Sequence, residues 1–270
     1  MKTMIQSLLK SAGIYNRVKA SRIYDIYWSV ADRTIIDRRS SEIAFYREIL
    51  PGLKEGDLIF DVGANQGTKV SVFLRLGAKV VAVDPDPHNQ QILNDSFHNL
   101  RIKKKPVTIV PKAVSDEVGE VTFWVDEPGS AKNTVSEKWV ATLREDDTRF
   151  GENLSFKNHY TVSTTTLDEM MEEFGCPCFI KIDVEGHEPA VIRGLNRAVP
   201  LLSFEVNLPE FLAEGRECIR LLNEIDPSGE FNYVAELDKG FGLEAWANFE
   251  DFDAHLRECS DPSIEIFWRT

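Results

Sequence analysis

The stretch Leu58-Ile-Phe-Asp-Val-Gly-Ala-Asn-Gln-Gly67 decides the fold of this chain. Residues 58–62 are expected to form a short buried strand, because apolar and β-branched residues dominate them and glycines bound them. A glycine turn follows at residues 63–67, and residues 68–76 have a helical pattern. In an open parallel sheet, a ligand binds at such a turn, just beyond the carboxyl end of a strand. Glycines let the backbone approach the ligand, and the free N–H groups of the helix favour an anion or a polarised group.

The spacing of the glycines indicates which ligand this turn binds. A dinucleotide site has the pattern G-x-G-x-x-G, with its middle glycine close to the pyrophosphate, whereas Ala64 and Asn65 fill that gap here. Asp61, on the strand before the turn, would repel a pyrophosphate but can bind an ammonium group. S-adenosylmethionine has an amino-acid end and a ribose end, and therefore fits better than a nicotinamide dinucleotide. The alternatives are a dinucleotide site and an ordinary strand–helix turn without a ligand.

A second acidic residue stands at the end of the next strand. Residues 78–83 are expected to form this strand, and Asp84 follows it. A carboxylate about 20 residues after the glycine turn is suited to accept hydrogen bonds from two ribose hydroxyls. A third strand is expected at residues 107–110, and the segment Ala113-Val-Ser-Asp116 after it lies at the edge where an adenine ring would lie.

The rest of the chain continues the alternation of strands and helices. Residues 126–160 interrupt it, and a polar stretch of this length is typical of a lid, a specificity insertion or a disordered segment. The element order predicts an α/β sheet with helices on both faces. Further strands are expected at residues 120–125, 178–182, 201–206, 231–236 and 264–268, the last two joined by a long loop, and helices at residues 87–98, 136–144 (partial), 166–175, 188–196 and 209–225.

The N-terminal part of the chain is expected to be a separate helical extension. Residues 1–52 contain amphipathic helical patterns that end at Pro51 and Gly52, and residues 53–270 then form the S-adenosylmethionine-binding domain. The extension is interpreted as covering part of the core. The alternatives are that it covers the active site or pairs two subunits in a homodimer.

Composition and charge restrict the classes of protein to consider. The 270 residues are enough for one large domain or for one domain with appendages, and 43% hydrophobic residues can fill a sizeable core. A net charge of −13 disfavours nucleic acid and anionic membranes as partners, and no apolar run approaches the ~18 residues of a membrane span. The cysteines form neither a redox C-x-x-C pair nor a zinc site. We expect four reduced thiols in a cytoplasmic protein, at Cys176, Cys178, Cys218 and Cys259.

A second group of charged residues follows the expected strand at residues 178–182. This strand delivers Lys181, Asp183, Glu185 and His187 to the same mouth of the sheet. Stability alone is a poor explanation for charged side chains concentrated at the carboxyl end of a buried strand, so we interpret them as functional. The alternative is an acid-rich helix N-terminus that complements the helix dipole.

With both groups of residues in view, the chain resembles the FkbM family of S-adenosylmethionine-dependent methyltransferases. The resemblance covers about residues 57–206 and implies a class I methyltransferase (Rossmann-like) fold, with seven strands in the order 3-2-1-4-5-7-6 and the last strand antiparallel. The motifs that carry it are Asp61-Val-Gly-Ala-Asn-Gln-Gly67, Val83-Asp-Pro-Asp-Pro87, Ala113-Val-Ser-Asp116 with Gly119 and Phe123, Thr166-Leu-Asp168, and Lys181-Ile-Asp-Val-Glu-Gly-His-Glu188. Two positions depart from the family: Asp84 stands where Glu is frequent, and His187 stands where the residue is usually small or variable.

Motif positions and residue chemistry together assign the cofactor-binding residues. The methionine end is assigned to Asp61, Gly63, Asn65 and Gly67, the ribose to Asp84, and the adenine border to Ala113, Val114 and Asp116, with Asp183 also counted as a cofactor contact.

The acceptor chemistry is assigned to the residues after the strand at 178–182. A hydroxyl is a poor nucleophile until its proton is lost, so a general base helps. Asp183 and His187 are the candidate bases, and Glu185 orients or polarises; for His187, a surface position without a role is the alternative. The oxygen ligands that magnesium prefers are also present at Asp183, Glu185 and Glu205, but no ligand geometry can be read from sequence and we assign no metal.

The predicted function is methyl transfer from S-adenosylmethionine to a hydroxyl of a small molecule or of a sugar-containing natural product or glycan. An oxygen acceptor is favoured because the chain lacks the Asn/Asp-Pro-Pro-Tyr/Phe signature of enzymes that methylate amide or adenine nitrogens. One alternative is a nicotinamide-dependent oxidoreductase, which the missing middle glycine disfavours. Another is a cofactor-binding module without catalysis, which the presence of Asp61, Asp84 and Asp183 disfavours. Residues 126–160 are expected to select the acceptor.

Overall fold

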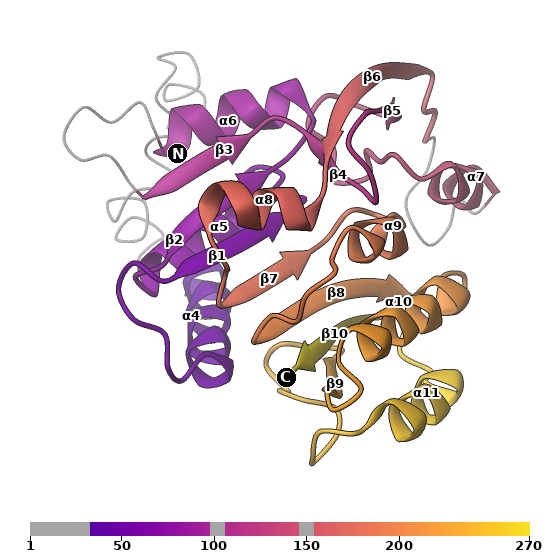
Figure 1. Cartoon of the computed structure of the whole chain (residues 1–270). Coiled ribbons are helices and arrows are strands. Elements are labelled where there is room, and N and C mark those ends of the chain that lie inside the picture. The colour runs from indigo at the N-terminus through magenta and orange to yellow at the C-terminus, as the bar shows by residue number, and fades with distance from the viewer. Residues whose placement is uncertain (1–32, 98–105, 146–153) are drawn as a thin grey trace.

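A seven-stranded sheet forms the centre of the molecule (Figure 1). The computed structural model describes residues 33–97, 106–145 and 154–270. Neighbouring strands of the sheet follow the order β3-β2-β1-β7-β8-β10-β9. These strands are β1 (Leu58–Val62), β2 (Lys79–Val83), β3 (Val107–Val110), β7 (Phe179–Ile182), β8 (Leu201–Asn207), β9 (Glu230–Val234) and β10 (Ser263–Arg269).

The strand order confirms the predicted class I methyltransferase fold. The short strands β4 (Ala113–Val114), β5 (Glu120–Val125) and β6 (Asn158–Thr165) form a separate sheet, so the strands of the large sheet, counted alone, follow the order 3-2-1-4-5-7-6. β3, β2, β1, β7 and β8 are parallel, and β10 is antiparallel to both β8 and β9.

Helices cover both faces of the large sheet, as predicted. Along β1, Ile59 packs in one core cluster with Phe73, and Phe60 packs in the other with Met170, because successive strand residues point to opposite faces. The first face is covered by α4 (Arg33–Ile49), α5 (Thr68–Arg75) and α6 (Pro87–Phe97), and the second by α8 (Leu167–Phe174), α9 (Glu188–Arg193), α10 (Leu212–Ile225) and α11 (Phe249–Glu258).

The small sheet lies beside the edge at which β1, β2 and β7 end (Figure 1). Between β5 and β6 the chain forms α7 (Glu137–Glu145), which matches the partial helix expected near residues 136–144. β6 was not predicted, and its first residues fall inside the segment 126–160. The prediction of a long loop before the last strand is wrong, because α11 lies there. This helix is capped by Asn248, whose side chain accepts the N–H of Asp251.

The N-terminal helix is part of the core. Phe45 and Tyr46 of α4, and Leu50 after it, pack in the same apolar cluster as Ile59 of β1. This part of the expected helical extension therefore covers the core, while residues 1–32 lie outside the described residues. The domain boundary at residue 52 and the homodimer stay predictions.

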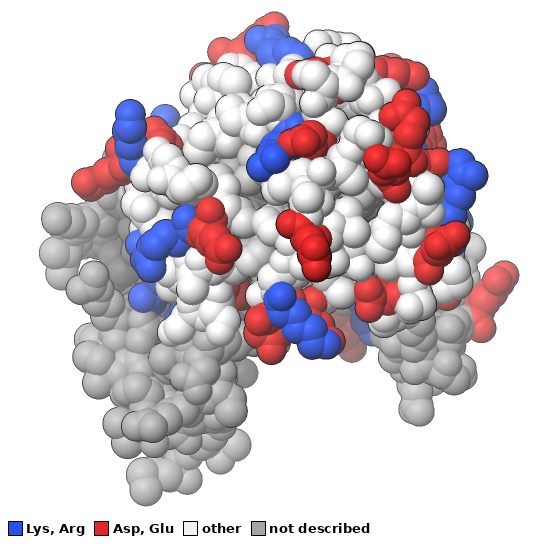
Figure 2. Space-filling model, turned by 90° about the horizontal axis from the view of Figure 1, so that it is seen from below, with Lys and Arg blue, Asp and Glu red and all other residues white. Residues whose placement is uncertain are grey.

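On the face of the molecule in Figure 2, positively and negatively charged side chains are mixed. Lysine and arginine side chains lie among aspartates and glutamates on this face and gather in no single patch. Within the described ranges, no helix has the length and apolar character needed to cross a membrane.

Candidate active site

The glycine turn after β1 lies against the end of β7. Gly63 has a φ of +82°, and a Cβ atom there would lie 1.8 Å from the carbonyl oxygen of Asp183. Glycine therefore lets β1 and β7 end side by side without a clash. The N–H groups of Gly63 and Ala64 both donate to the carbonyl oxygen of Val83, at 2.9 and 3.0 Å, and this fixes the turn beside β2.

Asp84 follows β2, and its carboxylate faces the glycine turn. Oδ2 accepts the N–H of Asn65 at 2.8 Å, while Oδ1 accepts the N–H of Asp86 at 2.9 Å and the Nδ2 amide of Asn89 at 3.2 Å. Burial raises the pKa of Asp84 to about 6, and these donors oppose that shift. The carboxylate is thus held in one orientation, between the turn and α6.

A cavity opens at the carboxyl ends of β1, β2 and β7. It brings together most of the residues predicted from sequence, namely Gly63, Asn65, Asp84, Ala113, Val114, Asp183, Glu185 and His187. Three predicted residues do not line it. Asp61 is buried in the sheet, Gly67 packs against the ring of Phe97, and Asp116 accepts a hydrogen bond from Ser115 Oγ at 3.0 Å. Their assigned cofactor contacts stay predictions.

Sequence reasoning missed one wall of this cavity. The wall comes from the segment between β5 and α7, through Ser130, Ala131, Asn133, Thr134 and Val135. The length and polarity of residues 126–160 predicted a lid, but no periodic pattern singled out these five. Asn89 of α6 and Phe123 of β5 also line the cavity, and only the motif position of Phe123 had marked it.

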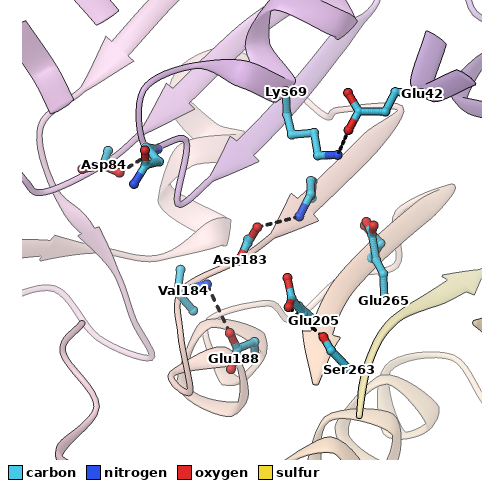
Figure 3. A network of polar contacts seen from close by, with 12 residues as sticks. Glu42, Lys69, Asp84, Asp183, Val184, Glu188, Glu205, Ser263 and Glu265 are labelled. Carbon is cyan, nitrogen blue, oxygen red and sulfur yellow. Dashed lines mark hydrogen bonds and ion pairs between the residues drawn. The ribbon is translucent and has the colours of Figure 1, made fainter. Parts of the chain in front are cut away.

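A buried lysine reaches the rim of the cavity from inside the sheet. Lys181 is 2% exposed, and its Nζ donates to Asp183 Oδ2 at 3.0 Å (Figure 3). Burial alone would lower the pKa of Lys181, but the carboxylates around it, first Asp183 and then Glu265, raise this pKa well above its usual value. The ammonium group is therefore charged at neutral pH and holds one Asp183 oxygen in place.

Asp61 lies next to this lysine in the sheet. The two residues are register partners on β1 and β7. Burial raises the pKa of Asp61 to about 7, and the positive charge of Lys181 opposes the shift. Asp61 Oδ2 and the hydroxyl of Tyr46 have no hydrogen-bond partner within the described part of the chain. A buried polar region thus lies between β1, β7 and α4.

Further polar side chains extend this region across β8 and β10. Ser203 Oγ donates to Glu265 Oε1 at 2.6 Å, and Ser263 Oγ donates to Glu205 Oε1 at 2.9 Å. Glu205 and Glu265 lie near Asp183 in Figure 3. Burial first, and then the charge of Asp183, raises the pKa of Glu205. The site therefore has more carboxylates than cations around it.

The loop after β7 is held by its own acidic residues. Glu188 Oε1 accepts the N–H groups of Val184 and Gly186, at 3.1 and 3.3 Å. Glu185 has a φ of +56°, and its carbonyl oxygen accepts a hydrogen bond from Thr134 Oγ1 at 2.8 Å. Burial and the neighbouring Asp183 raise the pKa of the Glu185 carboxyl well above its usual value. Glu188 thus holds the loop before α9, whereas Asp183 and Glu185 line the first cavity.

A second, smaller cavity adjoins the first. Asp183 and Glu185 line both. The rings of Trp139, from α7, and Phe211, before α10, lie 5.2 Å apart at its wall. Carboxylates complete it at Glu188, Glu205 and Glu214. The two cavities meet at Asp183 and Glu185, the arrangement that a donor site and an acceptor site require.

His187 lines the first cavity but not the second. Its Nε2 lies 3.0 Å from Ser115 Oγ, next to the predicted adenine border. Burial lowers the pKa of His187 to about 4, so the imidazole is neutral at physiological pH and weakly basic. Its geometry suits it to hold Ser115 better than to take a proton from an acceptor.

No metal-ion geometry is found in the described residues. None of their His, Cys, Asp and Glu side chains form a group of three or more that could hold a metal ion.

Comparison with known proteins identifies the family. The sequence profile of the methyltransferase FkbM domain matches residues 61–259, a range that includes the glycine turn, Asp84 and the loop after β7. The chain belongs to the FkbM methyltransferase family. It is therefore an S-adenosylmethionine-dependent methyltransferase.

Several known methyltransferases are similar to this FkbM methyltransferase. The hexuronic acid methyltransferase AglP of Haloferax volcanii is 27% identical over 190 residues, which are 68% of this chain and 69% of AglP. A TehB-like SAM-dependent methyltransferase from Corynebacterium glutamicum has a TM-score of 0.42 and 10% identity, over 93% of this chain and 100% of that one. The plantazolicin methyltransferase BpumL in complex with SAH has a TM-score of 0.41 and 11% identity, over 99% and 98% of the two chains.

The first cavity has the chemistry that S-adenosylmethionine requires. Asp84 offers carboxylate oxygens that can accept ribose hydroxyls, and Asn65 and Asp183 place polar groups at the end of β1 and β7. Ala113 and Phe123 add apolar surface that can lie against an adenine ring. The residues present thus fit the cofactor of this FkbM methyltransferase.

Proposed function

We propose that the protein transfers the methyl group of S-adenosylmethionine to a hydroxyl oxygen of a small molecule or of a sugar-containing natural product or glycan. The observation that carries this proposal is the position of Asp183, which lines both cavities and whose carboxylate accepts a hydrogen bond from Lys181 at 3.0 Å. A fixed carboxylate between donor and acceptor is what a hydroxyl needs to lose its proton.

The chain's own residues contribute positioning and proton transfer. The bound cofactor supplies a methyl group already activated on a sulfonium, so the reaction breaks the sulfur–carbon bond and forms an oxygen–carbon bond. Asp183 accepts the hydroxyl proton as that bond forms, through the oxygen that Lys181 leaves free. Glu185, with its raised pKa, can remain protonated and donate a hydrogen bond to the acceptor. Alignment of the two substrates accounts for the rest of the rate.

The charge of the second cavity favours a hydroxyl over a carboxylate acceptor. Its wall contains Glu205 and Glu214, and the nearby Lys138 ammonium is already paired with Glu214 at 2.7 Å. A negatively charged acceptor about 4 Å from one such carboxylate would meet a repulsion of about 4 kcal/mol at an effective dielectric constant of about 20. AglP is named for hexuronic acid, which supports a sugar-like acceptor, but the acceptor proposed here is methylated at a neutral hydroxyl.

An acceptor screen tests this proposal. The purified protein and S-adenosylmethionine are incubated with neutral glycosides, hydroxylated polyketides and matched uronates, and release of S-adenosylhomocysteine is measured. We expect turnover with a neutral hydroxyl compound. The product should be a methyl ether, which survives mild alkali, whereas a methyl ester is cleaved.

The variant Asp183→Asn separates binding from chemistry. We expect it to retain affinity for S-adenosylhomocysteine and to lower kcat by about 10²-fold or more, the range for a lost general base. An alkali-labile product, or full turnover by Asp183→Asn, would show that the proposed reaction is wrong.

A further inference from the structure

Asp86 is a buried carboxylate whose partners do not belong to the reaction described above. It lies two residues after Asp84, is 3% exposed, and uses both oxygens in hydrogen bonds. Oδ1 accepts the N–H of His88 at 2.8 Å, in the first turn of α6. Oδ2 accepts the N–H of Gly129 at 2.9 Å and the Nδ2 amide of Asn133 at 2.8 Å. One side chain thus joins the start of α6 to a segment about forty residues away in sequence.

The segment it binds is the wall of the cofactor cavity that sequence reasoning missed. We call residues 129–135 the strap. Ser130, Ala131, Asn133 and Thr134 of the strap line the first cavity, and Gln66 of the glycine turn donates from Nε2 to the Gly129 carbonyl oxygen at 3.4 Å. The other end of the strap is fixed by Thr134, whose Oγ1 donates to the carbonyl oxygen of Glu185 at 2.8 Å. The strap therefore spans the cavity from the end of β2 to the end of β7.

The strap also packs closely on α6. Gly129 has a φ of +76°, and a Cβ atom there would lie 2.5 Å from His88 Cδ2 and 3.2 Å from Asn89 Oδ1. That oxygen of Asn89 is buried without a hydrogen-bond partner among the described residues. The strap has other hydrogen bonds, from Gln66 Nε2 to the Gly129 carbonyl oxygen at 3.4 Å and between the backbones of Thr134 and Trp124 at 2.7 and 3.1 Å. The bonds that Asp86 accepts are those that join Gly129 and Asn133 to the start of α6.

We propose that Asp86 is a positioning residue for the cofactor, which it retains in the cavity by holding the strap in place. Asp84 and Asp86 belong to one rigid turn, because the N–H of Asp86 donates to Asp84 Oδ1 at 2.9 Å. The residue assigned to the ribose and the residue that anchors the strap are therefore fixed relative to each other. Asp86 acts on cofactor binding without contacting the cofactor. The proposal needs only the cofactor and is independent of the acceptor.

The variant Asp86→Asn tests the anchor selectively. The amide oxygen can still accept the N–H of His88 and keep the start of α6. Its NH₂ group then faces the two donors of Gly129 and Asn133, so the strap loses its anchor. If the strap is in place for only about a tenth of the time, the apparent Kd rises about tenfold.

Calorimetric titration with S-adenosylhomocysteine and hydrogen exchange of the strap amides are the two measurements. We expect Asp86→Asn to weaken binding about tenfold and to speed exchange at residues 129–135, at a temperature well below unfolding. Glu120→Gln removes the same charge from an exposed position on β5 and should leave both readouts within about twofold of the wild type.

A second variant tests the same contact from its other side, so that the test does not depend on correct folding of Asp86→Asn. Asn133→Ala removes the amide donor to Asp86, together with the bonds of this side chain to the Asp126 N–H and the Glu127 carbonyl oxygen, and leaves Asp86 free to hold α6, so it should also weaken binding and speed exchange. The two substitutions combined should weaken binding less than the sum of their effects, because the bond between Asp86 and Asn133 is lost in both. Wild-type affinity and wild-type strap exchange in both single variants would overturn the proposal. Absence of S-adenosylhomocysteine binding by the wild type would instead contradict the assignment of the cofactor to this cavity.

Discussion

Lys181 Nζ donates to Asp183 Oδ2 at 3.0 Å, and so joins a lysine that is buried in the sheet to a residue that lines both cavities. A buried ammonium is unfavourable unless carboxylates surround it. Glu265 also raises the pKa of this lysine. The charge of Lys181 in turn lowers the pKa of Asp61 and so stabilises its ionised form. The pair therefore links stability of the sheet to orientation of the proposed base.

Lys181→Met should destabilise the protein strongly. Removing the ammonium leaves buried carboxylates without their cation, and breaking a buried pair in this way costs about 3–5 kcal/mol. Urea unfolding followed by circular dichroism measures the free energy of unfolding. The control is Lys138→Met, which breaks an exposed pair with Glu214 and should cost at most about 1 kcal/mol. Equal unfolding midpoints for the two variants would contradict the role of Lys181.

Gly63→Ala should disrupt the site far more than the cost of placing alanine at a positive φ would explain. Its Cβ would lie 1.8 Å from the Asp183 carbonyl oxygen, so β1 and β7 would have to separate. Gly240 has a similar φ of +74°, and a Cβ atom there would have no other atom within 4 Å, so Gly240→Ala isolates the backbone cost of about 1 kcal/mol. We expect Gly63→Ala to lose binding of S-adenosylhomocysteine in calorimetry and Gly240→Ala to retain it. Retained binding in Gly63→Ala would show that the strands tolerate separation.

Cofactor affinity should fall as pH is lowered through about 6, the pKa of Asp84. Ribose hydroxyls donate to the ionised carboxylate, so binding favours the charged form and is strongest above this pKa. Well below it, the Kd should rise roughly tenfold per pH unit. Titration with S-adenosylhomocysteine between about pH 5 and about pH 8 measures this slope.

The variant Asp84→Asn serves as the control for that slope. It should bind more weakly at high pH and show a flatter dependence, since the titrating group is absent. Asp61, with a pKa of about 7, is still present in this variant. Burial raises the pKa of Glu188 to about 7 as well. An unchanged slope in Asp84→Asn would therefore show that Asp84 is not the titrating group and assign the pH dependence to Asp61 or Glu188.

His187→Gln should leave the pH dependence of turnover unchanged between about pH 6 and about pH 8. The pKa of His187, about 4, lies below this range because the side chain is buried. Glutamine can still hydrogen bond Ser115, so kcat should fall at most about tenfold, against about 10²-fold for Asp183→Asn. The measurement is the pH–rate profile with an acceptor found in the screen. Loss of its acidic limb in His187→Gln would restore histidine as the base.

Local sequence patterns were enough to predict most of the elements. β1, its glycine turn and α5 followed from apolar runs and glycine spacing, and the Thr166 side chain accepts the N–H of Glu169 at the start of α8 as a cap should. Two elements, β6 and α11, were missed for different reasons. β6 is polar along much of its length and is a strand because β4 and β5 pair with it. In α11 the cap at Asn248 was a readable signal that went unused.

The residues of the site divide in the same way. Asp84 and Asp183 could be placed in the cavity from sequence because each directly follows a strand, and parallel strands end at one edge. Asp86 and Asn133 could not be paired, since their contact joins segments far apart in the chain. His187 is at the predicted mouth, but its proximity to Ser115 is a tertiary contact that periodicity does not contain.

The sequence by itself determined the strands of the large sheet, the glycine turn and the acidic residues at the strand ends, because these depend on interactions between neighbours in the chain. Only the tertiary structure decided which buried charges meet. Asp61 faces Lys181 because of the register of β1 against β7, and a slip of one residue would turn one of them to the opposite face of the sheet. That register is set by the packing of both core layers at once, which no local pattern specifies.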